Sequence, residues 1–505
     1  MNDTATVKHR LEGVLESLEP ALDEESRPLV REFARRLLSR ASRDFVEGHS
    51  PQWLARQVRS AFELLEDTAE GEISVRVREL PGEGGEFAVQ TVMEDRAFIV
   101  DTIREYLHDR DYSILQLLHP VLRVDRDDAS RVRAVGGRDG EGTRTSVTFI
   151  LAEGRPDADE LERIREELGQ RLEKVRLATD DFDRMLEASH DVSRDLDEMR
   201  EFFPWRSAEL EEMQQFLEWL RDGNFVFLGY REYELLGGAD GGRRVAVREG
   251  SGLGILRDES ESRYTEPVPV DELDPDLQAR LLGGPLLIFS KTNSISPVHR
   301  NARMDYIGIK RMAPDGEVRG ERRFLGLLTA QAYSQDASQI PILRRKLEEI
   351  LEAEGAARGS HDYSLIHRIF NSMPKEELFL SSVPELLGVV ETVMKTEGAD
   401  EVRVTARADS LGRGVNVMVI LPAAKFSAEI RRKIQEELVE TYRGELLNYH
   451  LSMGGGDQAR LHFYLSSGLD EVSEVDVEAL EERVRQSARS WQERLTDALE
   501  EAHES

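Results

Sequence analysis

The chain has 505 residues, of which 39% are hydrophobic and 33% charged, and it carries a formal net charge of −32. That length predicts about three or four domains, and the composition is typical of globular proteins. The absence of cysteine excludes disulfides and thiol catalysis, and the negative charge argues against a nucleic-acid partner. No apolar run approaches the roughly 20 residues of a membrane helix, and no signal-peptide pattern is recognisable. We therefore expect a cytoplasmic protein with no membrane partner.

Helical spacing of apolar residues begins near residue 7 and lasts to about residue 66. Within this stretch Leu29, Val30, Phe33, Leu37 and Leu38 lie along one face of an expected helix. The spacing predicts an N-terminal helical region over residues 1–70.

Two later parts of the chain repeat one order of elements: a strand hairpin, a helix, two strands and a second helix. In the first copy, alternating apolar residues predict strands at 73–80, 87–93, 112–124 and 145–152, with helices at 96–110 and 157–184. In the second copy, strands are expected at 401–407, 415–421, 445–454 and 459–466, with helices at 425–442 and 476–502. This is the ferredoxin-like βαββαβ scheme with an extra leading strand, which small regulatory domains of the ACT type use. The repetition supports the assignment, although so common a scheme gives no function by itself.

Between the copies lies a third unit, in which the patterns predict a mostly antiparallel sheet with flanking helices. A helix is expected at 208–221, strands near 225–235 and 243–248, and a hairpin turn at 313–316. Helices return between residues 340 and 396. We therefore predict an α+β, multidomain fold in which two ferredoxin-like (ACT-type) domains flank a mixed antiparallel-sheet domain, with helical linkers. The expected divisions are 1–70, 71–187, 188–335, 336–398 and 399–505.

No segment has the pattern of a nucleotide, metal or acyl-transfer site. The glycines at 250–254 fail the spacing of the dinucleotide pattern GxGxxG, and no helix is expected after them. Those at 237–242 have strands on both sides and predict a hairpin loop. The 11 histidines are scattered, and Ser360 or Asp362 is expected to cap a helix rather than bind a metal. The sequence therefore predicts no catalytic, cofactor-binding or metal-binding residue.

Residues 291–323 concentrate positive charge in this acidic chain, with eight basic residues against four acidic ones. One interpretation is a docking face for an acidic neighbour, or an anion site. The alternative is an outer sheet face whose arginines pair with acids elsewhere on the same molecule. The docking hypothesis uses Lys291, Arg300, Arg303, Lys310, Arg311, Arg322 and Arg323.

Four segments give the sequence a specific resemblance to one family. They are residues 227–231 (FLGYR), 305–311 (DYIGIKR), 320–326 (GERRFLG) and 340–346 (IPILRRK). With them, the chain resembles the N-terminal region of the large bacterial NAD-specific glutamate dehydrogenases. The resemblance implies NAD-dependent oxidative deamination of L-glutamate to 2-oxoglutarate and ammonium, carried out by large homo-oligomers. It also implies that ACT-like domains and a PAS-like central domain serve regulation and assembly.

The family's lysine- and glycine-rich substrate segment and its Rossmann domain have no match in this sequence. No catalytic residue can therefore be carried over, NAD belongs to the full-length enzyme, and we expect the chain alone to be inactive. Two interpretations stay open. The chain is the N-terminal regulatory and assembly portion of such a dehydrogenase, with the rest of that polypeptide as its partner, or it is a stand-alone amino-acid-sensing or docking protein that regulates a separate catalytic subunit.

The resemblance also implies an amino-acid effector site where the first long strand of an ACT-type domain meets its first helix. Glu94, Asp95 and Arg96 occupy this junction in the first copy. The usual loop is roughly Asp-Arg-Pro-Gly, and Ala97 and Phe98 stand in place of its last two residues. The alternative role of Asp95 is to cap the following helix. The matching junction of the second copy, residues 422–425, has no such motif.

Overall fold

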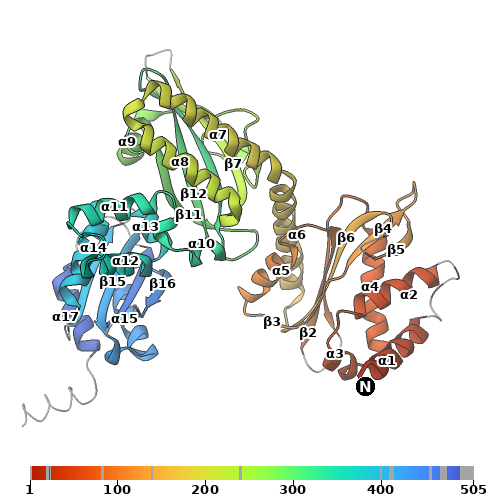
Figure 1. Ribbon diagram of the computed structural model, residues 1–505. Coiled ribbons are helices and arrows are strands. Elements are labelled where there is room, and N and C mark those ends of the chain that lie inside the picture. Colours follow the sequence, from red (N-terminus) through yellow and green to blue (C-terminus); the bar gives the residue numbers. More distant parts are fainter. Residues whose placement is uncertain are drawn as a thin grey trace, which may run out of the picture.

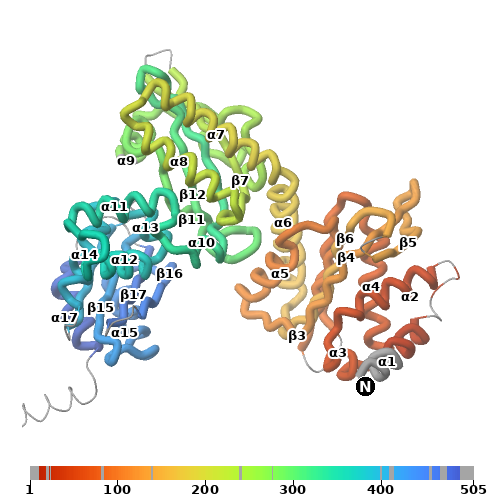
Figure 2. Tube along the Cα trace, in the orientation of Figure 1, coloured from red at the N-terminus to blue at the C-terminus, as the bar shows by residue number. Residues whose placement is uncertain are grey.

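The computed structural model describes residues 3–18, 22, 24, 26–80, 85–137, 140–237, 242–397, 401–408, 414–453, 458–466, 472 and 475–488. Within them, three antiparallel sheets of six, seven and four strands are each packed with helices. The chain is therefore α+β and multidomain, as expected. Figure 1 shows the three sheets in separate bodies, with the first body joined to the central one through a long helix, α6. The same path is visible in the chain trace of Figure 2.

Four helices precede the first sheet and cover one of its faces. They are α1 (Asp3–Leu18), α2 (Ser26–Leu38), α3 (Arg43–Gly48) and α4 (Pro51–Asp67). The stripe expected on α2 is buried at Val30, Phe33, Leu37 and Leu38, and it shares one hydrophobic core with Phe149 of the sheet. The helices expected before residue 66 are present, and their apolar faces join them to the sheet.

The first sheet has the strand order β1-β2-β6-β4-β5, with β3 also paired to β6. The strand expected over residues 112–124 is divided at His119 and Pro120, because proline lacks the N–H that a continuous ladder requires. The two halves, β3 and β4, pair with successive parts of β6. Helices α5 (Ile99–His108) and α6 (Ala158–Asp180) cover the face opposite the N-terminal helices. The strands are β1 (Ser74–Leu80), β2 (Glu86–Glu94), β3 (Ser113–Leu118), β4 (Val121–Arg126), β5 (Val132–Gly136) and β6 (Thr143–Glu153).

The third sheet repeats this arrangement, with the order β14-β15-β17-β16 matching β1-β2-β6-β3. In both sheets the leading strand pairs antiparallel with the second one. In a βαββαβ domain the last strand would lie beside this second strand, and here the leading strand occupies that position. The leading strand is thus a substitute and not an addition, and each unit runs ββαββα. Its elements are β14 (Arg403–Ala408), β15 (Gly414–Pro422), α15 (Ala428–Tyr442), β16 (Leu446–Ser452), β17 (Gln458–Ser466) and α17 (Val477–Ser487). The end of the last expected helix, beyond residue 488, lies outside the described residues.

The central sheet has the order β10-β8-β7-β13-β12-β11, with β9 paired to β7. Helices α7 (Phe182–Phe202) and α8 (Ser207–Trp219) pack on one face, and α9 (Pro275–Leu282) lies against the other. The hairpin turn expected at 313–316 is confirmed, since the N–H of Gly316 donates to the carbonyl of Ala313 at 2.9 Å. The strands are β7 (Phe225–Gly237), β8 (Arg243–Val247), β9 (Leu253–Gly254), β10 (Val268–Pro269), β11 (Leu287–Ile295), β12 (Arg303–Met312) and β13 (Val318–Leu328).

Five helices connect the second sheet to the third. They are α10 (Ala330–Ser334), α11 (Leu343–Ala353), α12 (His361–Ser372), α13 (Lys375–Leu380) and α14 (Val383–Thr396). One hydrophobic core runs from α7 and α8 through these helices to Met418 and Ile420 of β15. Val417 and Val419 of the same strand face α15 and α17 instead. The helical segment therefore fills the space between the two sheets. As expected, Ser360 caps α12 by accepting from the N–H of Tyr363.

Short turns of other helix types complete the described chain. A π-helical turn, Leu220–Asn224, follows α8. The 3-10 turns are Pro204–Arg206, Glu259–Glu261, Val270–Glu272, Ala337–Gln339 and Ala423–Lys425.

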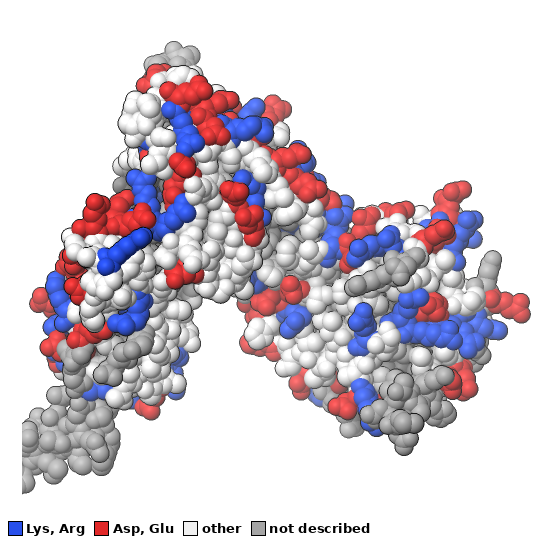
Figure 3. Space-filling model, viewed as in Figure 1, with Lys and Arg blue, Asp and Glu red and all other residues white. Residues whose placement is uncertain are grey.

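Acidic and basic side chains are interspersed over the face seen in Figure 3. Among the described residues, no helix is both long and apolar enough to cross a membrane. The same residues contain no group of three or more potential metal ligands placed to hold an ion.

Candidate functional site

The candidate effector loop lies at the end of β2, between Glu94 and the start of α5 at Ile99. Phe98, directly before the helix, has φ of 72°, a left-handed conformation that glycine adopts most easily. The backbone at Phe98 would thus suit the glycine of the usual loop. The ring of Phe98 packs against His299 of the central unit, with the two ring centroids 5.0 Å apart.

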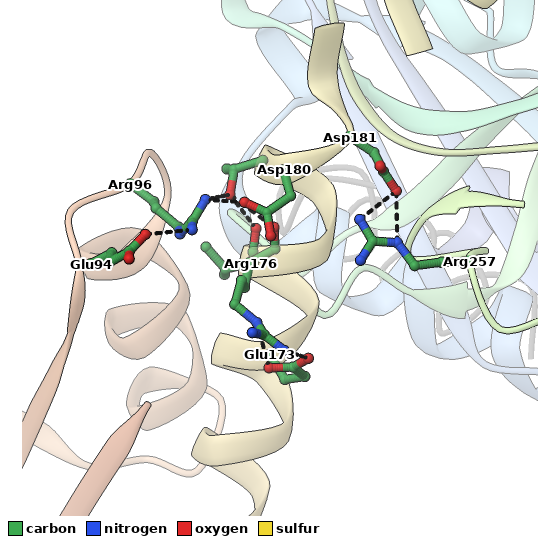
Figure 4. Close-up of polar contacts among 9 residues, drawn as sticks. Glu94, Arg96, Glu173, Arg176, Asp180, Asp181 and Arg257 are labelled. Carbon is green, nitrogen blue, oxygen red and sulfur yellow. Dashed lines mark hydrogen bonds and ion pairs between the residues drawn. The ribbon is translucent and has the colours of Figure 1, made fainter. Parts of the chain in front are cut away.

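Arg96 joins this loop to the C-terminal end of α6. Its Nη2 donates to a carboxylate oxygen of Glu94 at 2.9 Å, and its Nη1 donates to Asp180 and, at 3.4 Å, to the hydroxyl of Thr179. Figure 4 shows the guanidinium between the two carboxylates. Two acids from separate elements therefore share one arginine, whose side chain is only 18% exposed.

Asp95 fixes the other side of the loop to β6. Its carboxylate accepts from Nη2 of Arg144 at 2.5 Å, and its backbone N–H donates to the carbonyl of Arg144 at 2.8 Å. The capping alternative is wrong, because the residue at the N-cap of α5 is Phe98 and no side chain caps that helix. All three charged residues of the loop are thus engaged within the chain, and a ligand carboxylate there would compete with Glu94 and Asp180 for Arg96.

Asp181, the residue after Asp180, joins the first body to the central one. The helix expected over 157–184 ends here and α7 begins at Phe182. The Asp181 side chain is 3% exposed, and it accepts from the N–H of Gly254 at 2.8 Å and from Nε of Arg257 at 2.9 Å. Burial raises the pKa of Asp181, but these two hydrogen bonds, the charge of Arg257 and a third hydrogen bond from Arg184 at 3.0 Å outweigh it, and the net shift is downward. Sequence analysis missed this residue, since an aspartate inside a helical pattern looks exposed.

The glycines at 250–254 form a loop, as expected, and their amides meet carboxylates of the same chain. The N–H groups of Gly250 and Gly252 face Glu259 at 3.3 and 3.0 Å. Gly254 has φ of 61°, and a Cβ there would lie 2.2 Å from the carbonyl oxygen of Leu228. The hairpin expected at 237–242 is also confirmed by the antiparallel pairing of β7 with β8, although residues 238–241 lie outside the described residues.

The structure divides the seven residues of the docking hypothesis among different faces. Side chains alternate along a strand, so Arg322 and Arg323 of β13 point to opposite sides, as do Lys310 and Arg311 of β12. Arg322 faces α7 and lies 2.9 Å from the carboxylate of Asp195. These residues therefore do not share one exposed surface, and the pairing alternative describes Arg322.

The other residues of the docking hypothesis either have partners within the chain or are only partly exposed. Nζ of Lys291 lies 2.6 Å from the buried carboxylate of Asp305, and Arg300 donates to a backbone carbonyl at the end of β13 at 2.7 Å. Arg303 and Arg311 are partly exposed. A docking role stays a prediction, and it would rest on these two arginines.

A buried ionic cluster, which sequence analysis also missed, fixes α13 to the third sheet. The carboxylate of Glu377 lies 2.7 Å from Nδ1 of His462 on β17 and binds Arg407 of β14. Glu377 is only 5% exposed. Burial raises the pKa of Glu377, but His462 and Arg407 lower it by more than burial raises it, so the net shift is downward. The negative carboxylate is thus the form that this cluster stabilises.

Comparisons with known proteins agree with the repeated architecture. A model of the glutamate dehydrogenase ACT1 domain matches residues 33–168, and one of the ACT2 domain of the same enzymes matches residues 403–492. A third model, glutamate dehydrogenase helical motif 1, matches residues 340–399. The matched ranges cover the first sheet, the third sheet and the helical segment before it.

Three curated relatives are each described as NAD-specific glutamate dehydrogenase. The protein of Halomonas elongata is 31% identical over 414 residues, which are 81% of this chain and 25% of the relative. That of Pseudomonas aeruginosa is 28% identical over 500 residues, 97% of this chain and 30% of the relative. That of Mycobacterium tuberculosis is 23% identical over 428 residues, 81% and 25% respectively. The chain thus spans between a quarter and a third of the length of these relatives.

Proposed function

Because the chain belongs to the family of large NAD-specific glutamate dehydrogenases, we propose that it is the N-terminal regulatory and assembly portion of such an enzyme. The whole enzyme would convert L-glutamate, NAD and water to 2-oxoglutarate, ammonium and NADH. Every strand pairing in the described residues is antiparallel, whereas a dinucleotide-binding βαβ unit requires parallel strands. Our proposal therefore places the reaction in a part of the enzyme that the described residues do not include.

The observation that supports a regulatory role is a series of contacts that links the effector loop to the central unit. Arg96 holds Asp180 at the end of α6, and the next residue, Asp181, holds Gly254 and Arg257 of the central unit. An amino acid bound at Glu94, Asp95 and Arg96 offers a carboxylate to Arg96 in place of Asp180. Its binding energy would then bias the position of α6, which both bodies contact.

Assembly into a homo-oligomer is the second part of the proposal. Leu115 lies on β3, an outer strand of the first sheet, and Tyr449 lies on the outer strand β16 of the third sheet. Their side chains are 49% and 48% exposed. Exposed apolar side chains beside an unpaired strand edge favour pairing with another chain. A PAS-like central domain and a cytoplasmic location belong to the same proposal.

The test compares two arginines of the first body in the full-length enzyme. NADH formation from glutamate is followed while a panel of single amino acids is titrated. We expect Arg96→Ala to raise the half-maximal concentration of the effective amino acid at least tenfold, because a charge-assisted contact contributes about 1.5–3 kcal/mol. Arg104→Ala, which removes an exposed arginine of α5, should leave it unchanged.

An unchanged response in the Arg96→Ala enzyme would refute the effector role of the loop. The isolated 505-residue chain provides a separate test, since it should bind the same amino acid in equilibrium dialysis but form no NADH. Glutamate-dependent NADH formation by this chain would refute the proposal that the reaction takes place in another part of the enzyme. A response that requires a separate catalytic subunit would favour the stand-alone sensor.

A further inference from the structure

The face of the central sheet opposite α7 and α8 carries a cavity of about 580 Å³. Its walls come from β7, β11, β12 and β13, from α9, and from the segment that follows β9. This volume lies within the roughly 300–1,000 Å³ typical of small-molecule sites. The cavity is separate from the loop at residues 94–96 and does not depend on the function proposed above.

Strand register places one row of residues across the floor of this cavity. Ile288 of β11 pairs with Gly308 of β12, Gly308 pairs with Arg323 of β13, and Arg323 pairs with Arg231 of β7. Paired residues on neighbouring strands point to the same side of a sheet. Gly308 lies at the centre of the row, where Tyr306 and Glu321 pack against its backbone: a Cβ there would lie 2.9 Å from a ring carbon of Tyr306 and 3.0 Å from the carboxyl carbon of Glu321.

Arg323 is held rigidly, with part of its surface facing the cavity. Its guanidinium carbon lies 4.0 Å from the ring centroid of Tyr233 and 4.7 Å from that of Tyr306, one ring belonging to β7 and the other to β12. Such cation–π contacts fix the plane of the group. Burial raises the pKa of Tyr306, so its hydroxyl keeps a proton and donates it to Glu321. The Arg323 side chain is nevertheless 24% exposed.

Only part of the hydrogen-bonding capacity of Arg323 is used. Nη1 donates to the hydroxyl of Tyr233 at 2.9 Å, and Nε and Nη2 reach one oxygen of Glu321 at 3.4 Å. A guanidinium has five N–H donors. The hydroxyl of Tyr306 also forms a hydrogen bond with this guanidinium, so one of the five N–H groups remains within the described residues. A charge-assisted N–H bond of this kind is among the stronger contacts that a carboxylate can make.

The charges around the cavity favour an anion. Four arginines line it, namely Arg231, Arg263, Arg280 and Arg323, against three acids, Glu261, Asp274 and Glu321. Arg231 is 3% exposed, its guanidinium donates to the backbone carbonyls of Leu256 and Asp258, and its charge contributes to lowering the pKa of the Asp258 carboxyl, which is not part of the wall. Glu261 is paired outside the wall, with Lys174 at 3.3 Å. The wall therefore has positive charge that its own acids do not balance.

The rest of the wall is largely apolar. Aliphatic and aromatic groups are supplied by Val245, Tyr264, Leu277, Leu281, Ile288 and Leu325. From the partly exposed guanidinium of Arg323, the excess of positive charge and these apolar walls, we infer that the cavity binds a small organic carboxylate with an apolar or aromatic body. Arg323 binds the carboxylate, and the body lies along Ile288 and Leu325.

The test uses the full 505-residue chain and isothermal titration with two probes, octanoate and 4-phenylbutyrate, with succinate as a purely polar control. We expect at least one apolar probe to bind with a dissociation constant below about 1 mM, and succinate to bind at least tenfold more weakly. Arg323→Lys keeps the positive charge but removes the planar guanidinium that Tyr233 and Tyr306 hold in place, and it should weaken binding of the probe at least tenfold. Arg319→Lys, on an exposed arginine of the same strand, should not change binding.

A second variant covers the case in which Arg323→Lys fails to fold. Ile288→Trp fills the apolar end of the cavity and leaves Arg323, two strands away, in place, so it should abolish probe binding while circular dichroism stays unchanged. Absence of binding of both apolar probes up to about 10 mM would overturn the inference. Equal binding by folded Ile288→Trp and the unmodified chain would also overturn it, as would tighter binding of succinate than of either apolar probe.

Discussion

Removal of the Glu377 carboxylate should loosen the attachment of α13 to the third sheet. In the Glu377→Ala variant Arg407 and His462 lose their shared acid in a site where Glu377 and His462 are each 5% exposed. Breaking a buried ion pair from one side costs about 3–5 kcal/mol. Arg407 keeps a hydrogen bond to the hydroxyl of Ser381 at 3.0 Å and is 16% exposed, so the lower end, about 3 kcal/mol, applies.

Hydrogen exchange reports this loss locally, even though a multidomain chain does not unfold in one step. Since each 1.4 kcal/mol is a factor of ten, amides of β17 should exchange roughly 100-fold faster in Glu377→Ala than in the unmodified chain. Glu391→Ala removes a half-exposed acid of α14 whose ion pair, among the described residues, is with Lys395 four residues later, and it should change exchange less than threefold. If the two variants differ by less than about tenfold in β17, the cluster does not fasten the helix and the reasoning fails.

Three further outcomes follow from the geometry. Gly254→Ala should lower the stability of the central sheet by about 2–3 kcal/mol in urea unfolding, because the new Cβ meets a carbonyl at a positive φ; a loss below about 0.5 kcal/mol would contradict this. Gly308→Ala should cost about 1–3 kcal/mol by crowding Tyr306 and Glu321, and unchanged calorimetric unfolding would show that the row has spare room. The pKa of Asp181 is lowered in the folded chain, so its contribution is complete above about pH 4 and is lost as the pH falls through the folded value. Asp181→Asn should therefore flatten the acid limb of the unfolding curve, and an identical limb would exclude this role.

The spacing of apolar residues predicted most helices and strands, because it shows which side of each element is buried. Alternation in residues 73–94 and 401–421 and helical spacing in α2 locate the strands, the helices and the repeat. What the patterns could not show is which element covers a face or where two apolar runs divide. The run through Pro120 looks continuous in sequence, and the helix expected over 157–184 gave no sign of the break at Asp181, which binds Gly254. Most of α7 was not expected at all.

The candidate sites illustrate the same limit. The loop at Glu94, Asp95 and Arg96 was found because a family motif marks it, and its contact with Asp180, 84 residues away from Arg96, depends on the tertiary fold. The basic stretch was recognised as unusual, but charge counting merges residues that a strand sends to opposite sides. The opposite orientations of Arg322 and Arg323 could be predicted from their adjacent places in a strand, whereas the half-buried position of Arg323 depends on the register of three strands.

The division of the helix at Asp181 has a mechanical consequence. Helices α6 and α7 contain 23 and 21 residues, so at 1.5 Å per residue they are arms of roughly 35 and 32 Å that meet at one buried side chain. A rotation of about 5° at that joint displaces the far end of α7 by about 3 Å, close to half the pitch of a helix. Because the carboxylate of Asp181 lies where the two helices meet, a small change in the angle between them displaces their far ends by several ångströms.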